Sequence, residues 1–408
     1  MILFLQKALL YSIPLREMAG FRSGIPLRVG ELLIVSYIVY IFFTTSIERK
    51  LKVFNSSKLN LIIIGALFFN LILVFLISRR LPVNKEFLYK YLARNFVMLS
   101  FLISILIKPI RLNRKILNNF FKYMVMIQLL MFFLQLIGWN IEFFTLVNFS
   151  STRRYQGTAS EAGYLPTLIA PTLCYFRNSI KNKRYYYLAF FEIAMTFSSF
   201  GYFVLAIELL ISITRRKTKL TNKSILTFVG GSILVFVVLV FKWDSVEKKV
   251  NYSFQKILKY SQGQSYDFSV KARNEQLEYI KARIDSIPTT KKIFGAGTGR
   301  YSQIMGHEVK KDDFFEIADE AHTLYWSTIH DRGLIGITLF CGILLSLGLM
   351  IYKQRNNKVI MSFSYIYILQ IIHWKLTANM WLYFFWITAA FIISQYELKE
   401  KIELENTV

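Results

Sequence analysis

The chain has 408 residues, of which 54% are hydrophobic and 18% charged, whereas soluble domains average about 45–50% apolar and about 25% charged. This composition excludes an ordinary soluble enzyme and a disordered chain, and leaves a polytopic membrane protein. The formal net charge of +25 would suggest nucleic acid binding in a soluble protein, but in a membrane protein it indicates basic cytoplasmic loops. Cys174 and Cys341 lie in apolar runs and predict neither a disulfide framework nor a zinc site.

Apolar runs of spanning length occur along most of the chain. A membrane-spanning helix needs about 20 mostly apolar residues. The run 1–14 is short for a span and lacks the basic start and cleavage site of a signal peptide, so it is counted as a first helix. The other predicted spans lie at 30–47, 59–78, 90–107, 119–138, 162–177, 185–198, 200–214, 224–241, 333–352, 358–373 and 379–396. The predicted fold class is therefore all-α, with about eleven or twelve transmembrane helices.

The distribution of basic residues predicts the orientation. With the N-terminus inside, the short inward loops carry 20 Lys and Arg and the outward loops carry 10, as the positive-inside rule requires. The segment 79–90 carries four basic residues on the outward side and fits badly. The hydrophilic stretch 242–320 is nearly neutral, with 14 basic and 12 acidic residues, so the excess charge sits in the short loops and nucleic acid binding loses its support.

These counts divide the chain into three parts. Residues 1–241 hold the first nine helices, 242–332 form a large outward loop with short helices, and 333–408 hold the last three helices and a cytoplasmic tail. Both termini are expected in the cytoplasm. The glycine-rich run 295–299 has no following helix of the kind a dinucleotide site needs, so we interpret it as tight turns returning the chain to the membrane.

Polar side chains gather in three segments expected on the outer side, 153–161, 271–273 and 320–325. Tyr325 and Ile329 follow His322 at helical spacing, which predicts a short helix along the membrane surface. Gly333 would end that helix and release the next span. The carboxylates of Asp319 and Glu320 would raise the basicity of the His322 imidazole, although a lone interfacial histidine is more often a hydrogen-bonded surface residue.

Charged residues inside predicted spans need partners. Glu192 and Glu208 lie deep in neighbouring helices, where an acid is costly and is expected to face the bundle and pair with a cation. Arg94 lies near the outer end of its span, where it could snorkel to the surface or point into a polar cavity. The four histidines show no metal-ligand spacing, so we expect no metal.

Three stretches resemble one known family. The segment 322–336 resembles the "HNxY…ExGxxG" signature of bacterial O-antigen ligases and polymerases, with Thr323 for the asparagine and Asp331 for the glutamate. Arg273 followed by Pro288 and the 294–297 run resembles the family's "R…P…GxG" passage, and the 154–158 run resembles its "R…GT" passage. Two departures stand out, because Thr323 leaves the asparagine's role open and 198–201 reads SSFG where many members have a Ser-Arg pair.

The resemblance implies a protein of the bacterial inner membrane that transfers a glycan from an undecaprenyl diphosphate carrier at the periplasmic face, without a cofactor. It makes the outward loop 242–332 a periplasmic loop. His322 becomes the candidate general base, Arg273 and Arg154 the candidate diphosphate clamp, and Glu320 a further catalytic candidate. The arginine fork suits a diphosphate. Further substrate-binding candidates are Arg153, Arg94 and Tyr325. The implied partners are the lipid-linked oligosaccharide, membrane lipid and a chain-length regulator protein, and no nucleic acid.

Two alternatives to an O-antigen polymerase stay open. A ligase would transfer the glycan to lipid A–core, whereas a polymerase transfers it to another carrier-linked repeat unit; the Phe-, Ile-, Asn- and Lys-rich composition tilts the prediction to polymerase by analogy with surface-polysaccharide genes. A transporter or flippase for the same lipid-linked sugar should show charged residues along a path through many spans and no large late loop, and inverted repeats are the usual sign of a secondary transporter. Here the polar residues gather at one face, which favours an enzyme.

Overall fold

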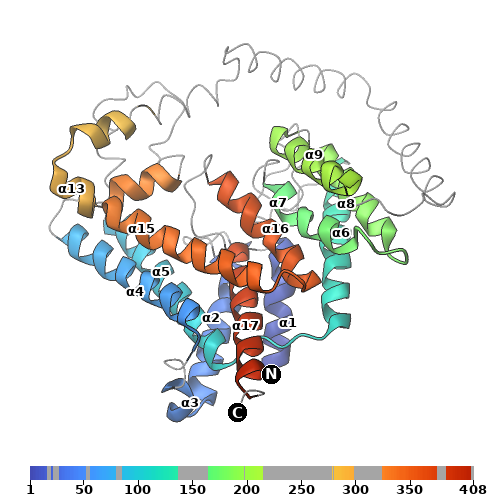
Figure 1. Ribbon diagram of the computed structural model, residues 1–408, viewed down its shortest axis with the longest axis horizontal. Helices are drawn as coiled ribbons and strands as arrows, with labels where there is room; N and C mark the ends of the chain where they lie inside the picture. Colours follow the sequence, from blue (N-terminus) through green and yellow to red (C-terminus); the bar gives the residue numbers. More distant parts are fainter. Residues whose placement is uncertain are drawn as a thin grey trace.

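The computed structural model describes most of the predicted helices (Figure 1). It covers residues 1–15, 20–21, 27–51, 56–79, 85–136, 164–196, 198–214, 278, 280–297, 324–374 and 383–405. In the first half the elements are α1 Ile2–Ser12, η1 Ile13–Leu15, β1 Gly20–Phe21, β2 Leu27–Arg28, α2 Val29–Thr44, α3 Ile47–Leu51, α4 Lys58–Arg79, α5 Lys85–Ile107 and α6 Arg114–Leu136. In the second half they are α7 Leu165–Phe176, α8 Lys183–Met195, α9 Ser199–Thr214, α13 Thr289–Phe294, α15 Leu324–Lys353, α16 Lys358–His373 and α17 Tyr383–Glu405.

The all-helical prediction is confirmed for these residues, apart from one small hairpin. In that hairpin β1 pairs antiparallel with β2, with Gly20 opposite Arg28 and Phe21 opposite Leu27. The predicted span at 224–241 lies outside the described residues. Every other predicted span coincides with a helix, because long apolar runs fold as helices when their backbone groups have no water to bind.

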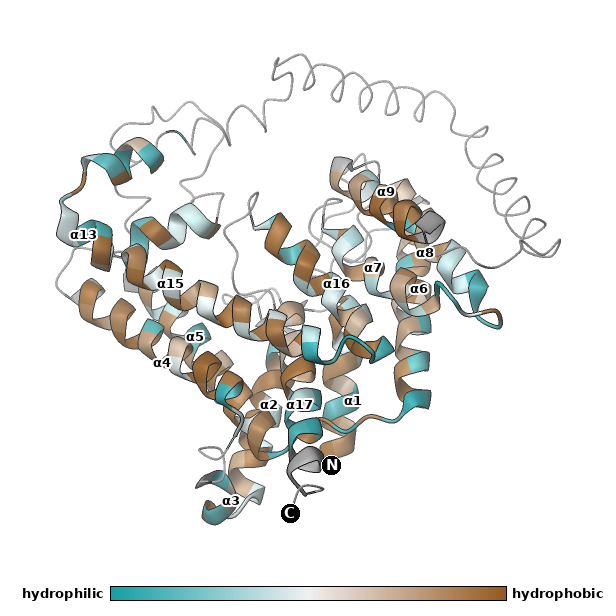
Figure 2. Ribbon diagram, in the orientation of Figure 1, coloured by the Kyte–Doolittle hydropathy of each residue, from teal (hydrophilic) through white to brown (hydrophobic). Residues whose placement is uncertain are grey.

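The hydropathy of the helices is consistent with a membrane protein (Figure 2). Among the described residues, three helices are long and apolar enough to cross a membrane by length and composition, at Lys58–Ser78, Arg114–Gln135 and Leu324–Lys353, and six apolar helices are shorter. Large apolar side chains also face outward, such as Phe43 on α2 and Phe69 and Phe75 on α4. Exposed apolar surface of this kind is typical of contact with lipid.

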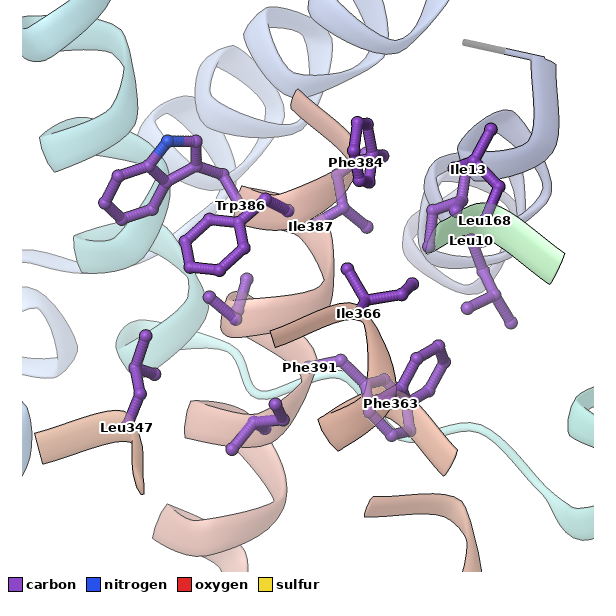
Figure 3. Packing of buried hydrophobic residues seen from close by; sticks show 14 of the residues in the cluster. Leu10, Ile13, Leu168, Leu347, Phe363, Ile366, Phe384, Trp386, Ile387 and Phe391 are labelled. Atoms are coloured by element: carbon purple, nitrogen blue, oxygen red, sulfur yellow. The ribbon is translucent and has the colours of Figure 1, made fainter. Parts of the chain in front are cut away.

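Helix α17 lies in the core of the bundle. Its residues from Phe384 to Ile393 are nearly all buried, as expected for a helix that is apolar on all sides. Phe363 and Phe391 meet with ring centroids 4.9 Å apart, and Figure 3 shows Leu10, Ile366 and Leu347 from other helices in the same apolar cluster. The first helix belongs to this core as well.

The run 1–14 forms a helix inside the bundle. Leu9, Leu10 and Ile13 are buried, and the amide of Gln6 donates to the Pro109 carbonyl at 3.2 Å. Helix α1 has 11 residues, so it is about 16 Å long. It is therefore too short to cross a hydrocarbon core of about 30 Å by itself.

The predicted cation for Glu208 is Arg177. Its Nε donates to Oε1 of Glu208 at 2.7 Å and its Nη2 to Oε2, and Nη2 also donates to the Tyr365 hydroxyl. This ion pair joins the C-terminus of α7 to α9 and α16, and the Glu208 side chain is fully buried. Glu192 is also fully buried, but neither of its carboxyl oxygens has a hydrogen-bond partner, so the expected cation for Glu192 is not found among the described residues.

We predict that Arg177→Met lowers the free energy of unfolding by about 3–5 kcal/mol, because it leaves the Glu208 carboxylate buried without its cation. The double variant Arg177→Met/Glu208→Leu should recover much of this loss. The measurement is the thermal unfolding midpoint of the detergent-solubilised protein. Lys281→Met is the control, since its ammonium pairs with Glu278 at 3.0 Å on the surface and should cost about 1 kcal/mol or less. Equal losses in the two single variants would contradict the assignment.

Candidate functional site

Most predicted site residues fall outside the part of the chain that the structure describes. These are His322, Arg273, Glu320, Arg154 and Arg153. The structure describes 288–297, from the passage that resembles "R…P…GxG", and 324–336, from the segment that resembles "HNxY…ExGxxG". Arg94 and Tyr325 are described as well.

Residues 288–297 form a short helix followed by a glycine turn. Pro288 precedes α13, and its carbonyl accepts from the amide of Lys291 at 2.9 Å, a place where proline is tolerated because it needs no amide hydrogen. Gly295 ends the helix with φ of 99° and Gly297 follows with φ of 102°. Only glycine adopts such angles readily, so the prediction of tight turns is confirmed.

This glycine turn packs directly against the start of α15. The Ala296 amide donates to the His330 carbonyl at 2.7 Å, and the Gly297 amide donates to the Asp331 carbonyl at 3.1 Å. A Cβ atom on Gly295 would lie 2.2 Å from the Asp331 carbonyl oxygen, so only glycine permits this approach. The structure thus brings together two stretches that both resemble the O-antigen family, and Figure 1 shows α13 beside α15.

Helix α15 breaks where the sequence predicts it. Gly333 has φ of 65° and ψ of −164°, which separates a short helix over 324–332 from the long apolar helix that follows. A Cβ on Gly333 would lie 2.2 Å from the Ile293 carbonyl oxygen at the end of α13. Glycine at position 333 therefore allows both the break in α15 and its close contact with the end of α13.

The short helix 324–332 is also attached to the end of α16. The Leu324 amide donates to the Trp374 carbonyl at 3.0 Å, and the Tyr325 hydroxyl donates to the Ile371 carbonyl at 2.8 Å. Tyr325 is only half-buried. The contact to Ile371 gives the Tyr325 hydroxyl a structural role in this structure, so its predicted part in substrate binding stays a prediction.

A buried polar cluster lies at the break. The Nδ1 of His330 is 2.9 Å from Oδ1 of Asp331, and both residues are buried. A carboxylate at that distance orients an imidazole. Next to this pair, Arg332 is 3% exposed and donates from Nη2 to the Thr328 hydroxyl at 2.8 Å.

Arg332 links the start of α15 to α4 and α5. Its Nη1 donates to Oδ1 of Asn70 at 3.0 Å, and the Asn70 amide donates to Oδ1 of Asn95 at 2.9 Å. Its guanidinium lies 5.5 Å from the centroid of the Tyr91 ring, a cation–π distance. Gly336 leaves room for this side chain, because a Cβ there would lie 2.2 Å from the Arg332 Cβ.

Sequence reasoning missed these linking residues. Asn70 lies in the middle of an apolar span, and a polar residue at membrane depth is a signal for an interhelical contact. Arg332 was part of a motif but had no predicted role.

Arg94 does not join the buried cluster, although its neighbour Asn95 does. The Arg94 side chain is exposed on α5, which fits snorkelling rather than a polar cavity. Helices α4 and α5 also line an apolar groove of about 590 Å³, and Arg94 is not among its lining residues. It is lined by Leu71, Ile72, Phe75, Leu76, Tyr89, Leu92, Ala93 and Phe96.

In the described residues no group of three His, Cys, Asp or Glu side chains is placed to hold a metal ion. What the described residues offer is a buried polar cluster where the turn after α13 meets α15, beside α4 and α5. Ser198, in the segment that departs from the family pattern, accepts from the Gly201 amide at 2.9 Å through its hydroxyl and so caps α9.

No protein-family model matches this chain, and no curated protein sequence matches it. The resemblance to O-antigen enzymes therefore rests on its sequence motifs.

We predict that Gly333→Ala destabilises the protein by about 2 kcal/mol or more, because alanine at positive φ is strained and its Cβ meets the Ile293 carbonyl. Gly342→Ala is the matched control, since nothing lies within 4 Å of a Cβ there and alanine is the better helix former. The thermal unfolding midpoint in detergent and the amount of protein in the membrane fraction measure the difference. If both variants unfold at the same temperature, the close contact at Gly333 is wrong.

Proposed function

We propose that the protein polymerises O-antigen or a related surface polysaccharide by joining repeat units carried on undecaprenyl diphosphate. The observation that carries this proposal is the contact between the glycine turn 295–297 and residues 330–333 of α15. Both stretches resemble passages of the same family. Each contains a glycine that the close approach of the other requires, since a Cβ on Gly295 would meet Asp331 and a Cβ on Gly333 would meet Ile293.

The chemistry follows from the substrate. The oxygen of an acceptor sugar hydroxyl attacks the anomeric carbon of the donor glycan while His322 takes the hydroxyl proton. The bond from that carbon to the diphosphate oxygen breaks, and undecaprenyl diphosphate leaves with the electron pair. Arg273 and Arg154 bind the diphosphate charge, with Arg153 beside them, and Glu320 supports the imidazole of His322. No nucleotide is needed, because the diphosphate is already an activated leaving group.

The described helices support the handling of a lipid substrate. The groove between α4 and α5 is lined only by apolar and aromatic side chains, so a polyprenyl chain could lie in it without burying a polar group. Arg94, an exposed cation on α5 outside the groove lining, stays a candidate for the charged end of the substrate.

The test is deletion of the gene and complementation, followed by gel analysis of the glycolipids. Loss of a polymerase should leave single repeat units on lipid A–core, and the intact gene should restore the ladder of longer chains. Accumulation of polymer on the carrier lipid would instead identify a ligase. An unchanged glycolipid pattern would reject both enzymes.

We predict that His322→Ala abolishes chain growth while the protein still inserts into the membrane, because the acceptor hydroxyl loses its base. His307→Ala is the matched control, since His307 lies in the same long segment and has no assigned role. The glycolipid ladder and a membrane-fraction blot of each variant measure the two effects. Normal ladders from His322→Ala would sink the base assignment.

A further inference from the structure

A second pocket, unrelated to the proposed catalytic site, lies where three helices begin. Its volume is about 390 Å³. Helices α6, α8 and α16 begin beside it, at Arg114, Lys183 and Lys358, and the end of α7 closes it. It is lined by Arg114, Lys115, Asn118, Tyr175, Phe176, Ser179, Asn182 and Lys358.

All charged side chains that line this pocket are positive. Arg114, Lys115 and Lys358 line it, and none of its lining residues is acidic. Arg114 and Lys358 are close enough for their positive charges to act on one another. Lys358 is also held over the Tyr175 ring, with Nζ 4.5 Å from the centroid. Cations gathered without a carboxylate repel each other, and an anion between them would relieve that repulsion.

The backbone adds to the same potential. Each helix carries about half a positive charge at its N-terminus, and three N-termini lie at this pocket. Amides at the starts of α6 and α16 already donate to the side chains of Asn113 and Asn357, so the backbone contributes mainly through the helix dipoles. Asn182 precedes α8 and makes no side-chain cap, so the side-chain amides of Asn182 and Asn118 and the Ser179 hydroxyl lie in the pocket wall as neutral hydrogen-bond donors. Cations, amides and helix N-termini together are the usual recognition set for a phosphate group.

The surroundings point to a lipid as the source of the phosphate. Three cations next to the pocket lie over tyrosine rings: Lys122 and Arg184 over Tyr185, at 5.4 and 4.9 Å, and Lys183 over Tyr187, at 5.7 Å. Tyrosine with lysine and arginine is the pattern of a membrane–water interface. Helix α6 is one of the three helices long enough to span, and it begins at the pocket. Buried Tyr175 and Phe176 give the pocket an apolar floor.

We propose that this pocket binds the phosphodiester headgroup of an anionic phospholipid. By the distribution of basic loops it faces the cytoplasm, on the side opposite the glycan chemistry. Basic pockets between transmembrane helices on that side are suited to lipid headgroups. The bound lipid bridges α6, α8 and α16 and holds their N-termini together. The proposal stands whether or not the protein is a polymerase.

The test compares lipid binding by the full-length protein and two charge-matched double variants. Arg114→Gln/Lys358→Gln removes two pocket cations, whereas Lys108→Gln/Arg111→Gln removes two exposed cations from the same loop region outside the pocket. Native mass spectrometry of each detergent-purified protein is titrated with phosphatidylglycerol, with phosphatidylcholine and with phosphatidylglycerol in the presence of inorganic phosphate. We expect one tightly bound phosphatidylglycerol, weakened roughly 30-fold by the pocket variant and little changed by the control.

Four results would overturn the proposal. The first is equal phosphatidylglycerol affinity of the wild type and the pocket variant, and the second is a loss of affinity in the control variant as large as that in the pocket variant. The third is binding of phosphatidylcholine as tight as that of phosphatidylglycerol. The fourth is displacement of the lipid by equimolar inorganic phosphate, which would make the ligand a soluble phosphate. Unfolding midpoints without lipid check that each variant folds. If the double variant fails to fold, Lys115→Gln, an exposed pocket cation, should still weaken binding, and its failure to do so also overturns the proposal.

Discussion

The contact between the loop and the membrane helices depends on the break in α15. In an uninterrupted helix the carbonyls of His330 and Asp331 would accept from amides four residues later. Gly333 takes the chain out of helical geometry, so these carbonyls need other donors, and the amides of Ala296 and Gly297 supply them. Buried backbone groups must be paired, and therefore the break and the glycine turn each require the other.

Polar side chains then fix which helices are neighbours. Lipid offers helices little hydrophobic reason to prefer one partner over another, so hydrogen bonds and close packing decide. Arg332 reaches Asn70, 262 residues away in the sequence, and Arg177 reaches Glu208 and Tyr365. Replacing either arginine by a residue of similar size would leave the apolar packing intact but remove the preference for this arrangement. The same helices that these contacts hold together carry the proposed catalytic segment at one end and the phosphate pocket elsewhere.

Much of this architecture could be predicted from the sequence. The helix positions follow from apolar runs, and the break at Gly333, the turns at 295–297 and a cation for Glu208 follow from local rules on glycine and buried charge. The contact of α13 with α15 and the hydrogen bond from Arg332 to Asn70 could not be predicted, because the positions of apolar spans in the sequence do not determine which helices pack against each other. The helix at residues 2–12 was correctly expected, but its place inside the bundle depends on packing against α2 and α6. The expectation of a cation beside Glu192 failed for the described residues, since burial alone does not supply a partner.

Hydrogen exchange at the amides of Ala296 and Gly297, in the full-length protein in lipid nanodiscs, tests the central contact most directly. Both amides donate to carbonyls of buried residues, so they should exchange orders of magnitude more slowly than free amides. Gly333→Ala should remove this protection and leave the amides of α17 unchanged. Exchange of Ala296 and Gly297 at free-amide rates, or full protection in Gly333→Ala, would contradict a loop held to the membrane helices through the break in α15.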